Sequence, residues 1–224
     1  MLEKFIRRNP KNPVLLTVPH AGNFYPNIFI QNLRLKLNKV RKIEDFQSNR
    51  ILDLMDFKSA DVIIAKCSRV VVDLNRSRNA VDNEMFINRV NSHQIDDLLN
   101  RFGICYHFDL HTMPSNALKR FKKKPDIVLG NNHGRISSNE LIDYMRKNFE
   151  NNGLIVQLNN PYAGGFITRN YGNPSKGVET IQIEVNRSLY MNEEKLLISN
   201  LKPLQEIFKK TFENFNLYTK YAAE

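Results

Sequence analysis

Short apolar runs, each followed directly by polar residues, limit what this chain can fold into more than any other feature. The run at 13–18 (PVLLTV) leads through Pro19 into His20, and the run at 104–110 leads into His111. Similar runs predict further strands at 60–65, 68–74, 125–130, 154–158 and 180–185. Apolar residues at helical spacing predict helices at 28–40, 45–57, 94–102, 139–152 and 193–218, the last bent near Pro203.

This alternation predicts an α/β fold with three layers, α/β/α, around a mixed, mostly parallel central sheet. No repeat, low-complexity tract or linker divides the sequence, so we expect a single domain over residues 1–224. In sheets of this kind, ligands bind beyond the carboxyl ends of the strands. The polar residues that follow each strand are therefore the candidates for a functional site.

The composition is that of a globular protein, with 42% hydrophobic and 25% charged residues. No apolar run approaches the ~20 residues of a membrane span. The N-terminal residues carry charges but no apolar signal segment, so we expect a cytoplasmic protein without a membrane partner. Cys67 and Cys105 are too few for a disulfide scaffold, and both are predicted to be small core residues.

The formal net charge is +10, and the only dense basic cluster lies at 119–124 (KRFKKK). Such a charge is compatible with nucleic-acid binding, but no other feature of the sequence supports that function. We expect the cluster to form a solvated basic face. The same field would attract a small anionic substrate.

Five polar residues leave the apolar scaffold at the strand ends: His20, Arg76, His111, Glu184 and Arg187. Two neutral imidazoles and one carboxylate make a three-ligand zinc site with a fourth position open to water, whose pKa the metal lowers. A second carboxylate can move the proton of that water, and an arginine can hold a substrate carboxylate. This combination is suited to metal-assisted hydrolysis of an amide in a small acidic molecule.

Seven segments match one protein family, and they occur in family order over about residues 13–191. They are 18–22 (VPHAG) with Pro26, 68–76 (SRVVVDLNR), 109–114 (DLHTMP), 126–130 (DIVLG), 160–168 (NPYAGGFIT), 171–174 (YGNP) and 182–191 (QIEVNRSLYM). On these segments the chain resembles the N-formylglutamate amidohydrolase (deformylase) family, a branch of the zinc-carboxypeptidase-like hydrolases. The resemblance implies a carboxypeptidase-like fold.

The resemblance also implies roles for individual residues. His20 and His111 match metal-binding histidines, and Glu184 matches the general base. Arg76 is expected to grip a substrate carboxylate and to help stabilise the oxyanion. The residues expected to bind substrate are Asn75, Arg76, Gly164, Gly165, Thr168 and Arg187, with Arg169 as a further candidate.

The sequence departs from the family pattern near the metal. Asn23 stands where carboxypeptidases carry a glutamate ligand, so the third ligand must come from elsewhere. The resemblance favours Asp45 for this role, and Asp53 and Glu44 are the alternatives. Family members also tend to carry an acidic residue where this chain has Asn49. The stretch between 76 and 109 is shorter than expected, which leaves the acyl group and the amino acid of the substrate open.

The family implies that the chain hydrolyses N-formylglutamate to formate and glutamate with Zn²⁺, for which Co²⁺ or Mn²⁺ could substitute. Another N-acyl amino acid or a short peptide as substrate is one alternative, and a non-catalytic binding protein on the same fold is another. Asp109 is expected to orient or flank His111 without binding metal. His107 shares a face with both by strand period. His93 and His133 could line the pocket or lie at the surface.

Overall fold

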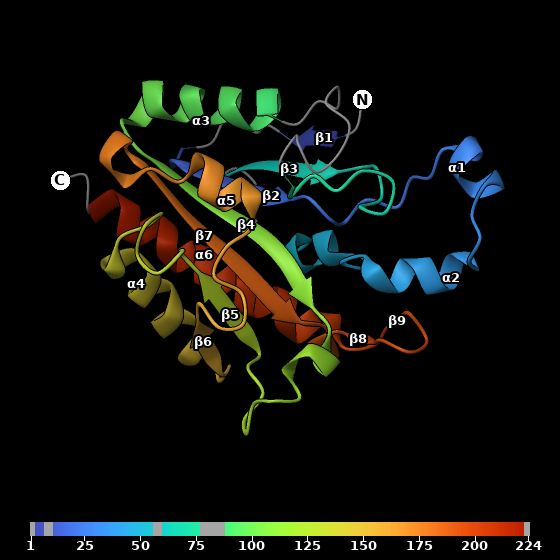
Figure 1. Ribbon diagram of the computed structural model, residues 1–224. Coiled ribbons are helices and arrows are strands. Elements are labelled where there is room, and N and C mark those ends of the chain that lie inside the picture. The colour runs from blue at the N-terminus through green and yellow to red at the C-terminus, as the bar shows by residue number, and fades with distance from the viewer. Residues whose placement is uncertain (1–2, 7–10, 56–59, 77–87, 222–224) are drawn as a thin grey trace.

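The computed structural model describes residues 3–6, 11–55, 60–76 and 88–221. Its centre is a seven-stranded sheet in the order β1-β3-β2-β4-β7-β5-β6 (Figure 1). The strands are β1 (Glu3–Ile6), β2 (Val14–Val18), β3 (Asp61–Ala65), β4 (Cys105–Met113), β5 (Ile127–Gly130), β6 (Val156–Leu158) and β7 (Val178–Asn186). Strands β2, β3, β4 and β7 run parallel, whereas β1 and β5 are antiparallel to their neighbours β3 and β7. The predicted mixed, mostly parallel sheet is confirmed.

Helices cover both faces of the sheet. The α-helices are α1 (Asn27–Gln31), α2 (Leu37–Val40), α3 (Asn88–Phe102), α4 (Asn139–Glu150), α5 (Phe166–Tyr171) and α6 (Leu201–Tyr221). Helices α3 and α5 lie on one face, and α4 and α6 on the other (Figure 1). The 3-10 helices within the described residues are Arg41–Ile43, Ser48–Leu52, Ser115–Leu118, Pro174–Lys176 and Arg187–Leu189, and a small hairpin joins β8 (Met191–Asn192) to β9 (Leu197–Ile198). The three-layer α/β/α architecture is therefore confirmed.

The main core lies between the sheet and helices α4 and α6. Phe108 of β4 is fully buried there and makes edge-to-face ring contacts with Phe212 and Phe215 of α6, with centroids 5.1 Å apart in each pair. Alternate residues of a strand point to opposite faces. The neighbours of Phe108 along β4, His107 and Asp109, therefore point to the face that α3 and α5 cover.

One predicted strand and three predicted helices differ from the structure. Residues 68–74 form a turn and not a strand, because the Ser68 carbonyl accepts hydrogen bonds from the amides of Val71 and Val72. The helix expected at 28–40 is divided into α1 and α2. The helix expected at 45–57 is, in its described part, only the 3-10 helix Ser48–Leu52, which begins after Gln47 in the left-handed region (φ 51°).

The third helix to differ is the last one. Helix α6 begins at Leu201, because part of the segment predicted to start it forms the β8–β9 hairpin. Pro203 consequently lies in the first turn of α6, where a missing amide proton costs no helical hydrogen bond and no bend is needed. Strands β1, β8 and β9 were not predicted.

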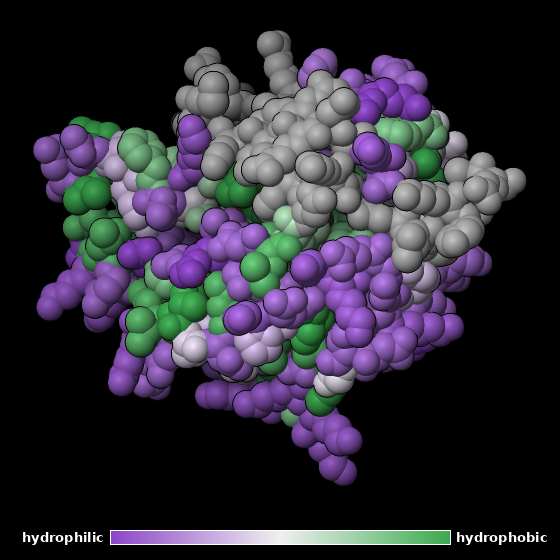
Figure 2. Space-filling view, turned by 180° about the vertical axis from the view of Figure 1, so that it is seen from behind, coloured by the Kyte–Doolittle hydropathy of each residue, from purple (hydrophilic) through white to green (hydrophobic). Residues whose placement is uncertain are grey.

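Residues 24–43, which contain α1 and α2, form an arm beside the sheet (Figure 1). Helix α1 has no buried residue, and the arm exposes five large apolar side chains, which belong to Phe24, Ile28, Ile30, Leu35 and Ile43. Apolar side chains gather at the left edge of Figure 2, the side on which α1 lies. The arm matters to the site because it leads directly into Asp45.

Contacts from the C-terminal third of the chain hold the segment that follows the arm. The Tyr190 hydroxyl donates a hydrogen bond to the Phe46 carbonyl (3.0 Å), and the Gln205 amide donates one to the Arg50 carbonyl (2.7 Å). Tyr190 is fully buried and Gln205 lies on α6. The backbone around Asp45 is thus fixed by elements far away in the sequence. No helix in the described part of the chain is long and apolar enough to span a bilayer.

Candidate metal centre and active site

The candidate site lies on the face of β4 and β7 that α3 and α5 cover. His111 of β4 pairs in register with Glu184 of β7, and Asp109 pairs with Gln182. Residues paired on neighbouring strands point to the same side of a sheet. All four side chains are buried. The alternation that puts apolar residues toward α6 therefore places titratable groups together on the other face.

His20, Asp45 and His111 converge at one point, although they come from three separate segments. Asp45 Oδ2 lies 3.2 Å from His111 Nδ1 and 3.6 Å from His20 Nδ1. One donor atom from each residue lies within 4.8 Å of the others, and all three residues are buried. His20 Nδ1 has no hydrogen-bond partner in the described part of the chain. Two imidazole nitrogens and one carboxylate oxygen fit a divalent metal such as zinc.

The outer nitrogen of each histidine faces a carboxylate. His20 Nε2 lies 2.8 Å from Asp73 Oδ1, and His111 Nε2 lies 2.9 Å from Asp109 Oδ2. A carboxylate in this position holds the proton on Nε2 and leaves the Nδ1 lone pair free. Both histidines are thus oriented with Nδ1 toward Asp45. Asp109 occupies the flanking position expected for it.

Asp45 is held as an anion. Burial alone would raise its pKa, but the neighbouring imidazoles of His111 and His20 lower the pKa well below its usual range. The Thr112 amide donates to Oδ2 (3.1 Å), and the Arg187 guanidinium donates to Oδ1 (3.1 Å). Arg187 also donates to the Lys42 carbonyl (2.9 Å). Arg187 therefore positions the Asp45 carboxylate, in addition to facing the cavity.

The converging donors open into a cavity of about 450 Å³. This volume suits a small-molecule ligand. Its wall contains His20, Lys42, Ile43, Asp45, Arg69, Asn75, His111, Thr112, Pro114, Pro161, Tyr162, Ala163, Gly164, Gly165, Gln182, Glu184 and Arg187. Lys42, Arg69 and Arg187 give this wall three cationic side chains, which lie beside the carboxylates of Asp45 and Glu184.

Glu184 supplies the cavity with a carboxylate that is not one of the three converging donors. Its Oε1 accepts a hydrogen bond from the Gln182 amide (2.7 Å). Burial raises the pKa of Glu184 to about 7, against the opposing effect of His111. A carboxyl group with a pKa near neutrality can both accept and donate a proton at cellular pH.

The structure brings some of the predicted substrate-binding residues to the cavity and leaves others outside. Asn75, Gly164, Gly165 and Arg187 line it. The Arg76 side chain is 63% exposed, pairs with Asp73 and does not line the cavity. Thr168 is buried below the wall.

Thr168 and Arg169 hold the glycine loop in shape. The Thr168 hydroxyl and the Arg169 Nε both donate hydrogen bonds to the Gly165 carbonyl (3.2 Å and 3.1 Å). Neither side chain lines the cavity. Their contacts therefore support the loop from outside and give neither residue a contact with a ligand.

Asp45 alone, among the three acidic residues considered for the third ligand, lies beside the histidines. The Asp53 side chain is 51% exposed and faces Arg50. Glu44 is buried but accepts hydrogen bonds from Tyr25 and Ser68. Its carboxylate is thus satisfied away from the cavity.

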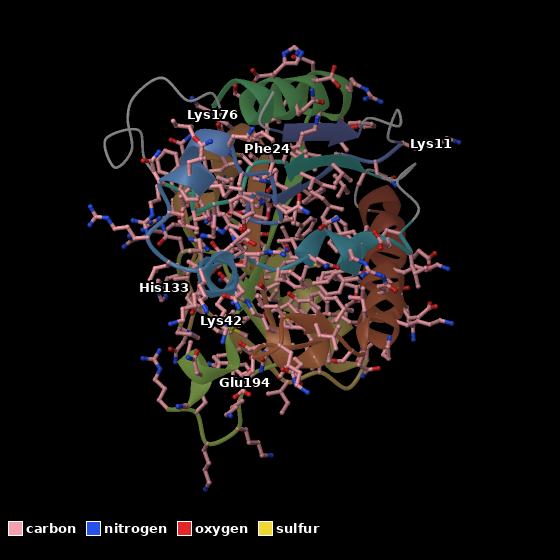
Figure 3. The ribbon with its side chains drawn as sticks, turned by 90° about the vertical axis from the view of Figure 1, so that its right-hand side faces the viewer. Lys11, Phe24, Lys42, His133, Lys176 and Glu194 are labelled. Carbon is pink, nitrogen blue, oxygen red and sulfur yellow. The ribbon has the colours of Figure 1, made fainter. Side chains whose placement is uncertain are left out.

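The remaining histidines and cysteines lie outside the cavity wall. His93 is exposed on α3, and His133 is exposed in a turn (Figure 3). Cys67 and Cys105 are buried free thiols, as expected of core residues.

Sequence reasoning missed three polar cavity residues: Lys42, Arg69 and Gln182. Arg69 donates to Asp73 Oδ2 (2.8 Å), and its other terminal nitrogen lies 3.8 Å from Asp45 Oδ1. Its spacing of four from Asp73 could have indicated a shared turn, but the apolar residues between them favoured a strand. Gln182 could have been found from strand period, since it lies two residues before Glu184.

Asn75 lies between the glycine loop and His111. It accepts a hydrogen bond from the Ile167 amide (2.8 Å), and its Nδ2 lies 3.1 Å from His111 Nε2. A Cβ atom on Gly165 would lie 2.1 Å from Asn75 Nδ2. The wall therefore requires glycine at 165 for steric reasons.

We expect Gly165→Ala to displace Asn75 and to lower activity more than stability. The φ of Gly165 is −88°, which alanine adopts without strain, so the effect comes from the clash alone. We predict a fall in kcat/KM of about tenfold or more, because small misplacements at a site are costly. Steady-state kinetics and the melting temperature measure the two effects. A fall in activity that only parallels global unfolding would contradict this account.

His107 should make the protein acid-sensitive. It is fully buried, its Nε2 lies 2.9 Å from Thr17 Oγ1, and burial lowers its pKa to about 4. The unfolded chain takes up this proton near pH 6.5, so stability present above that pH is lost as pH falls toward 4. Between about pH 7.5 and about pH 5 the loss from this group is about 2 kcal/mol.

Urea unfolding of wild type and His107→Gln at the two pH values measures this loss. The variant should lose about 2 kcal/mol less than wild type on acidification. The same substitution at the exposed His93 serves as the control. An equal loss in wild type and His107→Gln would show that another group carries the acid sensitivity.

Comparisons with known proteins identify the family of the chain. A family model described as N-formylglutamate amidohydrolase matches residues 12–92 and 88–191. The N-formylglutamate deformylase of Pseudomonas putida is 25% identical, over 81% of this chain and 82% of its own, and that of Pseudomonas aeruginosa is 24% identical, over 81% and 83%.

Two solved structures share the fold. The crystal structure of N-formylglutamate amidohydrolase from Ralstonia eutropha JMP134 has a TM-score of 0.87 at 20% identity and covers 99% of both chains. A gene product of Agrobacterium tumefaciens has a TM-score of 0.67 at 19% identity, over 96% of both. The family model spans most of the chain, including all three converging donors and Glu184. This chain belongs to the N-formylglutamate amidohydrolase family.

Proposed function

We propose that this protein is a metal-dependent amidohydrolase that cleaves N-formylglutamate to formate and glutamate. The observation that carries the proposal is the convergence of His20 Nδ1, His111 Nδ1 and Asp45 Oδ2 next to the free carboxylate of Glu184. The unpartnered, buried Nδ1 of His20 supports a metal at this point, because a buried polar atom without a partner is costly. Family membership supports the substrate.

Zinc is our choice of metal, with His20, Asp45 and His111 as its ligands and Co²⁺ or Mn²⁺ as substitutes. When bound, such a metal lowers the pKa of water and polarises a carbonyl group. Asp73 and Asp109 would keep the two imidazoles oriented. Arg187 would hold the Asp45 carboxylate in place. The protein therefore presents the three donors without rearrangement.

Glu184 would act first as the general base and then as the general acid. With its pKa raised to about 7, the ionised carboxylate accepts the proton of the attacking water. The same group then gives that proton to the leaving amine nitrogen of glutamate. Gln182, which donates to Oε1, would fix the orientation of the carboxylate during both transfers.

The basic residues of the cavity would bind the substrate carboxylates. Arg69 and Lys42 line the cavity, whereas Arg76 lies outside it. We therefore assign binding of the substrate carboxylates to Arg69 and Lys42. Arg187 also lines the cavity, but its guanidinium donates to Asp45. Arg76 instead pairs with Asp73 (3.1 Å), the residue that faces His20.

Metal content and formate release test the proposal together. Protein purified without chelator should contain about one metal ion per chain, and the His20→Ala, His111→Ala double variant should contain none. Wild type should release formate from N-formylglutamate. A folded wild type that binds no zinc, cobalt or manganese would contradict the proposal and favour a non-catalytic binding protein. Release from other N-acyl amino acids alone would retain the mechanism and change the substrate.

A further inference from the structure

A second cavity of about 480 Å³ adjoins the first. The two share Lys42, Pro114 and Arg187, so one begins where the other ends. The second cavity extends from these shared residues to the β8–β9 hairpin, where Glu193 and Glu194 lie in its wall. Lys42 and Glu194 mark this side of the molecule in Figure 3. A ligand in the first cavity can therefore continue into the second.

Three lysines give the second cavity its charge: Lys42, Lys119 and Lys124. We call it the lysine cavity. Lys119 and Lys124 are the two ends of the dense basic cluster in the sequence. No ion pair joins any of the three ammonium groups to a carboxylate within the described residues.

The two acidic residues of the lysine cavity, Glu193 and Glu194, offset only part of this charge. Glu193 accepts hydrogen bonds from the Ser115 amide (3.0 Å) and hydroxyl, so it is bound to the wall. Glu194 is exposed at the rim. The guanidinium of Arg187 faces both cavities but is committed to Asp45. Unpaired ammonium groups lining a hollow favour an anion.

We propose that the lysine cavity binds the side-chain carboxylate of the second residue in an extended substrate, an N-formylated acidic dipeptide. This inference rests on the proposed function. The formyl group ends in a hydrogen atom. A larger substrate that keeps the N-formyl group intact is therefore extended through a carboxyl group of the glutamate residue. A second glutamate joined there carries its own carboxylate away from the scissile bond. The lysine cavity is the basic hollow contiguous with the site.

The expected effect is moderate, because lysine–carboxylate pairs near the surface each contribute little. Two such contacts together should favour an acidic over a neutral second residue by about five- to tenfold. The preference should weaken with salt, since exposed charges are screened.

The experiment compares N-formyl-glutamyl-glutamate with N-formyl-glutamyl-glutamine, which has the same size and lacks the terminal side-chain charge. Wild-type kcat/KM should favour the first by about five- to tenfold, and the Lys119→Ala, Lys124→Ala variant should lose that preference. The matched control is Lys122→Ala with Lys123→Ala. It removes the same charge from the same cluster at positions outside the cavity wall, and it should keep the preference.

Calorimetric binding of the unformylated dipeptides separates this inference from the proposed function. Tighter binding of glutamyl-glutamate than of glutamyl-glutamine, lost in Lys119→Ala, Lys124→Ala, supports the lysine cavity even if no formate is released. In that case only the proposed function fails. Equal binding of both dipeptides by wild type overturns the inference, as does a preference that both double variants reduce equally.

Discussion

Glu184→Gln should abolish most turnover while leaving the fold and the metal site intact. The amide cannot accept the proton of the attacking water, and general acid–base catalysis contributes about 10²–10⁴-fold. Burial disfavours the ionised form of Glu184, so the neutral amide should not lower the melting temperature. The measurements are kcat for formate release, metal content and thermal unfolding.

The control for this variant is Glu179→Gln on the same strand. Glu179 accepts hydrogen bonds from the amide and hydroxyl of Ser138, outside the cavity wall, so its substitution should leave turnover unchanged. Wild-type activity should also fall as pH drops below about 7, since only ionised Glu184 accepts a proton. Near-normal turnover in Glu184→Gln would remove this residue from the mechanism.

Asp45→Asn should remove most of the affinity for metal. The substitution keeps the shape of the side chain and an oxygen that can accept from Arg187, but it removes the anionic donor. Changes around a metal that leave its ligands in place already cost about 10–100-fold in affinity, so the loss of a ligand should exceed about 100-fold. Elemental analysis and zinc titration measure it directly.

Thermal unfolding gives a second readout that needs no activity. Added zinc should raise the melting temperature of wild type, because a ligand that binds only the folded state stabilises it. It should not do so for Asp45→Asn. The control is Asp53→Asn at the exposed alternative position, which should respond to zinc as wild type does. A zinc response in Asp45→Asn and none in Asp53→Asn would reverse the ligand assignment.

The strands that carry the site could be predicted from the sequence because their signal is local. The apolar positions of β4 and β7 alternate with polar ones. This two-residue period determines which side chains lie on the same face of the sheet. His111 and Glu184 could thus be placed together before their register was known. His20 was identified because it follows the end of a strand, and the family resemblance added Asp45, which no local periodicity connects to the others.

The loops of the site could not be predicted in this way, because distant contacts decide their shape. The three consecutive valines at 70–72 have strand propensity, yet the segment turns so that Asp73 reaches both His20 and Arg69. This turn brings Arg69 to the cavity and leaves Arg76 outside. Asp45 likewise does not begin a helix, since its carboxylate binds the Thr112 amide and Arg187.

The contacts that hold the segment around Asp45 have a consequence for the order in which the protein becomes competent during synthesis. His20, Asp45 and His111 leave the ribosome before the residues that support Asp45. Arg187, Tyr190 and Gln205, which fix the Asp45 carboxylate and its flanking backbone, follow all three of them in the sequence. A nascent chain that has exposed only the three converging residues therefore lacks the contacts that hold Asp45, and the candidate site is complete only after Gln205 has emerged.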